Sequence, residues 1–338
     1  RRRPANVAQQ YERYMWIARQ FNRRVNRHLL AHSIDAQRDA YFGFTNGCLE
    51  TLELLGERGV LTIADQIDPG IVEEQLVIEK QQRWPGWQPT PGRVPENYWQ
   101  RLAAERAAAS YVLVNSQWSR RAYVQQGVPD ETIIVVPHAY EVGDATPPGR
   151  TDDGPLRVLY LGSVILRKGV PYLIEAARQL VGRGVHIDIV GRIDINLDAI
   201  TDPPANVTFH GPVTRDRLAQ VYAAADVFVL PTISDGFAIT QLEAMAQGLP
   251  VIATPNCGDV VTDGVDGLIV PIRDAVALAE AIVRLDDDRQ ALAAMSQAAR
   301  IKARQFTLDH YHQRLVKQLA DKGTSLSDVT GPDAPQHE

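Results

Sequence analysis

Residues 226–254 constrain the fold of this chain more than any other segment. Residues 227–230 are an apolar run that ends at a proline, a pattern typical of a buried strand. A helix is expected to begin near Phe237 or Ala238 and to end at Gly248, and a second apolar run follows it. Two buried strands joined through one helix predict a parallel sheet whose faces are covered by helices.

The start of this helix is suited to a phosphate ligand. The amides of Phe237, Ala238 and Ile239 are expected to have no partner inside the helix and to lie at the positive end of its dipole, so they attract anions. Asp235 and Glu243 flank them, and at about 1.5 Å per residue these carboxylates lie roughly 12 Å apart along the axis. This spacing suits a diphosphate with a hydroxyl-rich group at each end. The alternative is that Asp235 only caps the helix and Glu243 is solvated.

A second loop brings basic side chains to the end of a neighbouring strand. Residues 157–161 form an apolar run that ends at Gly162, and a helix is expected to open at Pro171, since proline is favoured in a first turn. Arg167 and Lys168 lie between these elements, where they can neutralise a diphosphate. Taken alone, the pair is a weak signal that is better explained as solvated loop charge.

Together these segments resemble the C-terminal domain of the retaining glycosyltransferases of family four, which have the GT-B fold. The family pattern Gly-Arg-Leu-x-x-x-Lys-Gly is matched by Gly162, Lys168 and Gly169. The pattern Glu-Gly-Phe-Gly-x-x-x-x-Glu-Ala-x-Ala-x-Gly-x-Pro-Val-Ile-Ala is matched by Gly236, Phe237, Glu243, Ala244, Ala246, Gly248, Pro250, Val251, Ile252 and Ala253. Similar residues continue over roughly residues 105–320.

The resemblance implies a role for each matching position. Glu243 would hold the ribose hydroxyls, and Lys168 would neutralise the donor diphosphate. Asp235 stands where the family has a Glu near the donor sugar, so Lys168 and Asp235 are the expected catalytic residues. The expected donor-binding residues are Gly162, Ser163, Arg167, Lys168, Gly236, Phe237, Ala238, Ile239 and Glu243. Neither a metal nor another cofactor is expected, because basic residues and helix dipoles replace the cation; the donor would be a UDP-, GDP- or ADP-sugar.

The chain also departs from the family pattern. Asp235 is one methylene shorter than the usual Glu, and Ser163 occupies the position of a phosphate-binding Arg, for which Arg167 is a candidate substitute. His138 stands where the family usually has Asn. The chain opens with residues 1–4, Arg-Arg-Arg-Pro, and shows no leading strand with a glycine-rich turn. The first domain is therefore expected to be incomplete, or the chain to be degenerate.

The expected fold class is α/β of the GT-B type, with two Rossmann-like domains whose parallel sheets face a cleft. A chain of 338 residues with 45% hydrophobic content is long enough for two cores. The expected parts are an acceptor-side domain at 1–142, a linker at 143–155, a nucleotide-sugar-binding domain at 156–306, a terminal helix at 307–322 that crosses back to the first domain, and a disordered tail at 323–338.

In the first domain we expect a helix over about residues 8–30, a strand at 41–45, a helix at 48–58 and a strand at 61–63. A long irregular stretch is expected after that strand. Near residues 83–97 it holds Trp84, Trp87 and four prolines. These tryptophans either belong to an acceptor-side loop or pack structurally.

Charge limits the range of partners. The net charge of −6 gives no general case for nucleic acid. Residues 1–28 nevertheless contain eight arginines against one glutamate, and Tyr14, Ile17 and Phe21 share one face of the expected helix. That helix has either a solvated basic face or a peripheral contact with an anionic membrane, where a lipid-linked acceptor is found. Two cysteines and no apolar run of about 20 residues favour the cytoplasm, including the inner face of the membrane.

The sequence thus predicts a retaining, metal-independent glycosyltransferase that moves a sugar from a nucleoside-diphosphate sugar to the hydroxyl of a glycan or lipid-linked acceptor, in glycan, polysaccharide or glycolipid biosynthesis. A nucleotide-sugar 2-epimerase of the same fold is one alternative, but it needs a carboxylate for proton abstraction in the first domain. A non-catalytic nucleotide-sugar-binding fragment is the other. A dehydrogenase is disfavoured because no Gly-x-Gly-x-x-Gly follows a strand.

Overall fold

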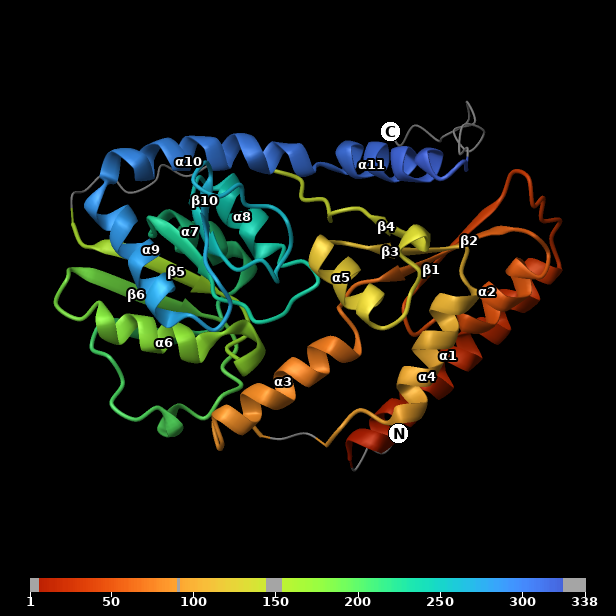
Figure 1. Ribbon diagram of the computed structural model, residues 1–338, viewed down its shortest axis with the longest axis horizontal. Coiled ribbons are helices and arrows are strands. Elements are labelled where there is room, and N and C mark those ends of the chain that lie inside the picture. Colours follow the sequence, from red (N-terminus) through yellow and green to blue (C-terminus); the bar gives the residue numbers. More distant parts are fainter. Residues whose placement is uncertain (1–5, 90–91, 144–153, 325–338) are drawn as a thin grey trace.

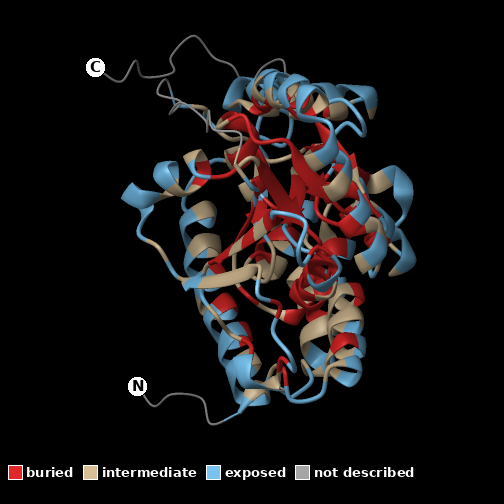
Figure 2. Cartoon of the chain, turned by 90° about the vertical axis from the view of Figure 1, so that its left-hand side faces the viewer, coloured by how far each residue is buried: buried red, intermediate tan, exposed pale blue. Residues whose placement is uncertain are grey.

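The computed structural model describes residues 6–89, 92–143 and 154–324. Within them, two parallel sheets lie side by side, and each has helices packed on it (Figure 1). Buried residues concentrate in the strands and on the inner faces of the helices (Figure 2). The expectation of an α/β chain with two parallel sheets is therefore confirmed.

The first sheet has the order β1-β2-β3-β4 among the described residues, and all of its strands are parallel. Its strands are β1 (Ala40–Phe44), β2 (Leu61–Gln66), β3 (Tyr111–Val114) and β4 (Ile133–Val135). The helices of this part are α1 (Val7–Leu30), α2 (Leu49–Gly56), α3 (Ile71–Arg83), α4 (Glu96–Ala108) and α5 (Gln117–Gln125), with a short 3₁₀ turn, η1, at Asp130–Thr132.

The second sheet has the order β10-β9-β8-β5-β6-β7 in the described part of the chain, again all parallel. Its strands are β5 (Leu156–Leu161), β6 (Val185–Val190), β7 (Val207–Gly211), β8 (Val227–Leu230), β9 (Val251–Ala253) and β10 (Gly267–Ile269). The helices are α6 (Val170–Gln179), α7 (Leu218–Ala223), α8 (Thr240–Ala246), α9 (Ala275–Asp287), α10 (Arg289–Ala303) and α11 (Leu308–Asp321). Short 3₁₀ turns are η2 (Leu166–Lys168), η3 (Leu197–Ala199), η4 (Arg215–Arg217) and η5 (Arg304–Phe306).

Both faces of the second sheet are buried, which explains why its strands read as continuous apolar runs. Val158 and Tyr160 of β5 belong to a core that includes residues of α6 and α9. Leu159, between them, belongs to a second core that contains Leu242 and Met245 of α8. The strand positions predicted here are confirmed, because a fully buried strand is marked by its apolar residues alone.

The prediction of a long irregular stretch after β2 is wrong. Residues 71–83 form helix α3, which lies between the two sheets (Figure 1). Its buried residues are Val72 and Lys80. The Lys80 ammonium lies 3.2 Å from the hydroxyl of Tyr172 in α6. Because α3 packs against both parts of the chain, it lacks the single apolar stripe by which an amphipathic helix is recognised.

Helix α1 does not bury the face on which its apolar residues gather. Tyr14, Ile17 and Phe21 are 40%, 44% and 55% exposed. The buried residues of this helix are Met15, Ala18 and Asn22, and the amide of Asn22 donates to the carbonyl of Gly47 at 3.0 Å. The hydroxyl of Thr51 donates to the Oδ1 atom of Asn22 at 2.6 Å. A polar contact with α2 and the loop before it thus orients this helix.

Trp84 and Trp87 pack structurally, which settles the alternative that the sequence left open. Trp87 belongs to the core of the second sheet, and the partly buried Trp84 packs against that core. The ring of Trp84 meets that of Tyr172 edge to face at 4.9 Å between centroids. The carbonyl of Trp87 accepts from the amide of Asn196 at 2.6 Å.

Helix α11 returns from the second part of the chain to the first sheet. Its residues Tyr311, Leu315 and Leu319 pack against a core that contains Ile63 and Ile134. Helices α10 and α11 therefore follow one another along the same side of the molecule (Figure 1). Most of the predicted linker at 143–155 and almost all of the predicted tail at 323–338 lie outside the described residues.

Candidate functional site

The two loops that the sequence singled out converge at the carboxyl ends of β5 and β8, which are adjacent strands. The ammonium of Lys168 in η2 forms an ion pair with the carboxylate of Asp235, and the two side chains are only 15% and 17% exposed. Ligands of open parallel sheets bind at this end of the strands. The basic loop of Lys168 and the acidic loop of Asp235 are therefore in direct contact.

Gly169 makes this close approach possible. Its φ angle is +74°, and a Cβ atom at this position would lie 1.7 Å from the carbonyl oxygen of Pro231. Only glycine tolerates both the left-handed backbone and the contact. The Lys168 loop can therefore lie directly against the end of β8.

Gly162 and Ser163 lie at the end of β5, as predicted, where the backbone is equally crowded. A Cβ atom on Gly191, at the end of β6, would lie 1.9 Å from the carbonyl oxygen of Gly162. The carbonyl of Ser163 accepts a hydrogen bond of 2.7 Å from the hydroxyl of Tyr160. These contacts fix the position of the backbone at Gly162 and Ser163. The Ser163 side chain is uncharged, so it adds no positive charge near Lys168.

Arg167 is held by groups of α3 and of the loop around Asp235. Its guanidinium lies 3.1 Å from the carboxylate of Glu73 in α3 and donates to the carbonyl of Ser234 at 3.1 Å. The carboxylate of Asp235 is 4.0 Å away. The positive charge of Arg167 is thus already compensated by two carboxylates.

Glu73 is a site residue that sequence reasoning missed. Besides Arg167, it accepts a hydrogen bond of 2.8 Å from the hydroxyl of Ser234, which in turn accepts from the indole of Trp118 at 3.1 Å. Burial raises the pKa of Glu73 to about 7, the cation of Arg167 opposes this shift, and the nearby Asp68 carboxylate reinforces it. A carboxylate just after the end of a parallel strand was a signal in the sequence, because that end faces the site.

The prediction that α8 begins near Phe237 is wrong, with a consequence for the site. The helix begins at Thr240, and the amide of Ala238 donates to the carbonyl of Cys257 at 3.0 Å. The side chain of Gln241 donates to the same carbonyl at 2.7 Å. The segment around Cys257 therefore occupies one of the three amides expected for phosphate. Among the described residues, the amides of Phe237 and Ile239 have no backbone acceptor.

Glu243 lies on α8 with its side chain held in place. Its Oε2 atom accepts a hydrogen bond of 2.8 Å from the hydroxyl of Tyr222 in α7. Burial raises the pKa of Tyr222, and the charge of Glu243 adds to that shift, so the phenol remains a donor. A carboxylate accepts several hydrogen bonds, so this contact orients Glu243 and leaves it able to bind further hydroxyls.

The first part of the chain closes over the Asp235 loop. A Cβ atom on Gly236 would lie 2.1 Å from the carbonyl oxygen of Ile67 and 3.0 Å from the amide of Asn115. The same Asn115 amide lies 3.2 Å from the Nε2 atom of His138. Burial lowers the pKa of His138, opposed by the charge of Asp235. A neutral imidazole thus lies beside the ring of Phe237, at 5.3 Å between centroids.

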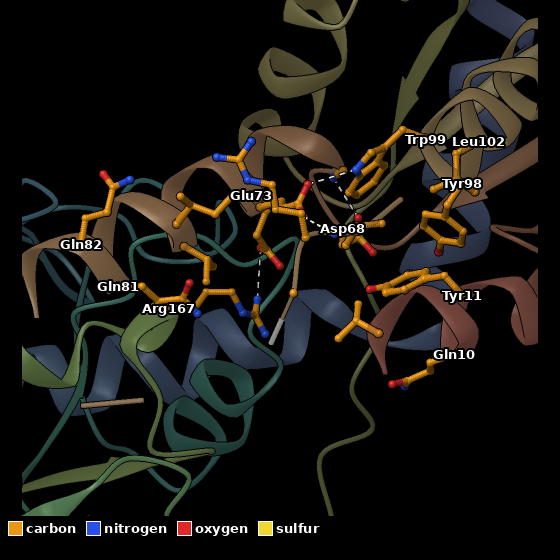
Figure 3. Close-up of a pocket in the computed structure, with 18 residues that line it drawn as sticks. Gln10, Tyr11, Asp68, Glu73, Gln81, Gln82, Tyr98, Trp99, Leu102 and Arg167 are labelled. Atoms are coloured by element: carbon orange, nitrogen blue, oxygen red, sulfur yellow. Dashed lines mark hydrogen bonds and ion pairs between the residues drawn. The ribbon is translucent and has the colours of Figure 1, made fainter. Parts of the chain in front are cut away.

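A cavity of about 720 Å³ is lined in part by Arg167 (Figure 3). Helices α1, α3 and α4 form most of its wall. Its lining includes three aromatic residues and three acids, Tyr11, Tyr98, Trp99, Asp68, Glu73 and Glu74. The cavity therefore adjoins the Lys168–Asp235 pair through the Arg167 side chain.

Two further observations concern the described residues alone. No group of three or more His, Cys, Asp or Glu side chains among them is arranged to bind a metal ion. In the same residues, none of the helices combines the length and the apolar character that crossing a bilayer requires.

Comparison with known proteins finds likeness over the second part of the chain and part of the first. Residues 155–288 match the family described as "Glycosyl transferases group 1". The chain is 31% identical over 248 residues to a D-inositol 3-phosphate glycosyltransferase of Xylanimonas cellulosilytica, an alignment that covers 65% of this chain and 59% of the relative. It is 32% identical over 179 residues to the protein of that name from Nocardia farcinica, covering 48% of this chain and 40% of the relative. The chain thus spans about three fifths or less of these relatives.

Solved structures confirm the GT-B fold. Sucrose-phosphate synthase from Thermosynechococcus elongatus superposes with a TM-score of 0.68 at 22% identity, covering 92% of this chain and 79% of that one. Anabaena Alr3699/HepE, solved in complex with UDP-glucose, superposes with a TM-score of 0.60 at 20% identity, covering 84% of this chain and 79% of that one. At this level of identity the likeness concerns the fold alone.

Proposed function

We propose that this chain, which matches the family "Glycosyl transferases group 1" over residues 155–288, transfers a sugar from a nucleoside-diphosphate sugar to an acceptor hydroxyl. The observation that carries the proposal is the convergence of Lys168 and Asp235 at the ends of adjacent strands. Glu243 follows on the next helix, held by Tyr222. A cation beside one carboxylate, with a second carboxylate on the following helix, suits a nucleotide sugar, whose diphosphate separates two groups rich in hydroxyls.

Binding of the donor involves an exchange of partners at Lys168. In the free protein its charge is compensated by Asp235. A diphosphate carries more negative charge than one carboxylate, so it draws the ammonium toward itself and leaves Asp235 to accept hydrogen bonds from the donor sugar. The amides of Phe237 and Ile239 add hydrogen bonds to the phosphates, and Glu243 binds the ribose hydroxyls.

In the transfer step, the acceptor oxygen forms a bond to the anomeric carbon while the bond from that carbon to the phosphate oxygen breaks. The departing phosphate oxygen takes the proton of the acceptor hydroxyl on the same face, so the anomeric configuration is retained. Lys168 stabilises the charge that develops on the diphosphate, which makes a divalent cation unnecessary in this proposal. The side chains otherwise contribute by holding donor and acceptor in reacting geometry.

The acceptor is a glycan or a lipid-linked glycan in this proposal, at the cytoplasmic face of a membrane. Helix α1 supports this placement, because Trp16 and Phe21 are 57% and 55% exposed on a helix rich in arginine. Exposed aromatic residues beside arginines suit the interface of an anionic bilayer.

A thermal-shift screen of the chain with UDP, GDP and ADP tests the proposal, followed by product analysis with the matching nucleotide sugar. We expect one diphosphate to raise the melting temperature and to define the donor base. Absence of any shift at millimolar concentration would refute the assignment. An isomerised donor formed without acceptor would identify a 2-epimerase, and binding without transfer or donor hydrolysis would identify a non-catalytic binding protein.

A further inference from the structure

The cavity beside Arg167 combines aromatic surfaces with hydroxyl groups. Tyr11 of α1 and Tyr98 of α4 meet edge to face, with ring centroids 4.6 Å apart. The ring of Trp99 lies next to that of Tyr98 at 5.4 Å. In Figure 3 the hydroxyl of Tyr11 points toward Asp68 and the hydroxyl of Tyr98 points toward Tyr11, and all three residues line the cavity. Such a wall offers flat apolar contact together with polar groups that fix the orientation of a ligand.

The charge of the cavity is predominantly negative. Asp68, Glu73 and Glu74 line it, and the arginines in its wall are Arg93 and Arg167. Arg167 is already paired with Glu73 and lies 4.0 Å from the carboxylate of Asp235, which does not line the cavity. The Glu73–Arg167 pair therefore adds no net charge, and the carboxylates of Asp68 and Glu74 outnumber the remaining cation, Arg93, by one.

The carboxylates of Glu74 and Asp68 differ in how many hydrogen bonds their oxygens already accept within the protein. Glu74 accepts from the amide of Val94 at 2.8 Å and from the indole of Trp99 at 3.0 Å, one bond to each oxygen. The Oδ1 atom of Asp68 accepts from the amide of Gly70 at 2.8 Å. Asp68 is exposed to the cavity, so its Oδ2 atom is available to a hydroxyl donor.

The titration of neighbouring groups agrees with a negative potential. Burial raises the pKa of Tyr11, and the charges of Glu74 and Asp68 raise it further. Burial also raises the pKa of Tyr98, again reinforced by Asp68. Both phenols therefore stay protonated and remain hydrogen-bond donors near neutral pH.

The cavity is also in the right place to hold the second substrate. Arg167 lines it, and the next residue in the chain is Lys168, which pairs with Asp235. Glu73 belongs to both regions, since it lines the cavity and accepts from Ser234 beside Asp235. A ligand in the cavity therefore lies next to the sugar end of a donor bound at Lys168.

From these observations we infer that the cavity binds the acceptor, and that it selects an uncharged sugar or polyol over a phosphorylated one. Asp68 and the tyrosine hydroxyls would pair with ligand hydroxyls, and the rings of Tyr98 and Trp99 would cover the apolar face of the ligand. A phosphate group would instead face the carboxylates of Asp68 and Glu74, and like-charge contacts of this kind oppose binding. This inference rests on the proposed glycosyl transfer.

Saturation-transfer NMR titrations of the full chain with UDP present test the selection without relying on activity. The probes are two matched pairs, myo-inositol with myo-inositol 3-phosphate and mannose with mannose 6-phosphate. We expect a neutral probe to bind and its phosphorylated partner to bind at least about tenfold more weakly, which corresponds to roughly 1.4 kcal/mol. Failure of both neutral probes to bind, or tighter binding of the phosphorylated ones, overturns the inference.

Variants of Asp68 and Tyr98 test whether these residues cause the preference for neutral over phosphorylated ligands. Asp68→Asn keeps an oxygen for the Gly70 amide but removes the charge, so we expect it to narrow the preference for the neutral probe several-fold. Tyr98→Ala should abolish binding of the neutral probe, whereas Tyr98→Phe keeps the ring and should retain most of it. Glu57→Gln, an exposed residue of α2's C-terminus, removes the same charge elsewhere and serves as the control.

The outcome separates this inference from the proposed function. If UDP, GDP or ADP binds but the phosphorylated probes are preferred, the cavity assignment fails while the donor site stands. If no nucleotide binds but the neutral probes still bind with the expected dependence on Asp68, the cavity stands as a sugar site and the transfer proposal fails. An unchanged preference in Asp68→Asn contradicts the electrostatic argument directly.

Discussion

Glu73 of α3 and Arg167 of η2 form an ion pair of 3.1 Å that joins the two parts of the chain at the edge of the candidate site. The side chains are only 17% and 26% exposed, so solvent screens this contact weakly. Both residues also contact the Ser234–Asp235 loop. The relative placement of the two sheets and the geometry around Lys168 are therefore coupled through one carboxylate and one guanidinium.

Replacement of Lys168 by Ala should chiefly reduce turnover. The variant removes the cation that compensates the departing diphosphate, and loss of one such electrostatic group lowers kcat by about 10²- to 10³-fold. Initial rates of transfer or of donor hydrolysis measure the effect. Lys317→Ala changes an exposed lysine of α11 and should leave the rates as they are. Equal rates in Lys168→Ala and wild type would remove Lys168 from the mechanism.

Glu243→Ala should abolish nucleotide binding, and Tyr222→Phe should weaken it. Loss of the Tyr222 hydroxyl leaves Glu243 in place but frees its side chain, and a hydrogen bond to a charged group contributes about 1.5–3 kcal/mol. Calorimetry with the diphosphate selected by the thermal-shift screen gives both affinities. Glu280→Ala, on the exposed face of α9, is the matched loss of a carboxylate. Unaltered affinity in both site variants would place the nucleoside elsewhere.

Glu73 should give the stability of the protein a specific pH dependence. Its pKa is raised to about 7 in the folded chain, above the ordinary value of 4.5, so the folded state holds the proton more tightly than the unfolded state does. This contribution to stability is fully present below about pH 4.5 and is lost as the pH rises through about 7, a change on the order of 3 kcal/mol.

Urea unfolding of wild type and Glu73→Gln at pH 5 and pH 8 checks this sign. Glutamine does not titrate, so the variant should gain stability relative to wild type as the pH rises. Asp65, whose pKa burial raises to about 6, titrates in both proteins and cancels in the difference. Parallel stabilities at the two pH values would contradict the raised pKa of Glu73.

Gly169→Ala should destabilise the chain far more than Gly182→Ala. Both glycines have positive φ angles, +74° and +84°, which cost alanine about 1–2 kcal/mol each. A Cβ atom on Gly169 also meets the Pro231 carbonyl oxygen at 1.7 Å, whereas nothing lies within 4 Å of one on Gly182. Forcing atoms into such a packed position adds about 1–3 kcal/mol. Urea unfolding measures the free energy of unfolding of the two variants. An equal loss in both would show that the positive φ angle alone is responsible and that the contact with Pro231 costs nothing.

Features that depend on neighbouring residues in the chain could be predicted from the sequence, and features that depend on distant segments could not. The strands of the second sheet were recognisable because burial on both faces makes them continuously apolar. Helix α3 was missed because its environment comes from both parts of the chain, and the buried residue Lys80 gives no apolar signal. The exposure of Ile17 and Phe21 on α1 was equally hidden, since the position of Asn22 against Thr51 decides which face is buried.

The sequence alone determined the order of strands and helices in the second part and brought Lys168 and Asp235 to adjacent loops, because apolar runs, glycines and prolines act over a few neighbouring residues. The tertiary structure alone decided that the amide of Ala238 is taken by Cys257, that Arg167 is paired with Glu73, and that α1, α3 and α4 enclose an acidic cavity. Those features depend on which distant segments meet and on how much water remains between them, and no local pattern of residues carries that information.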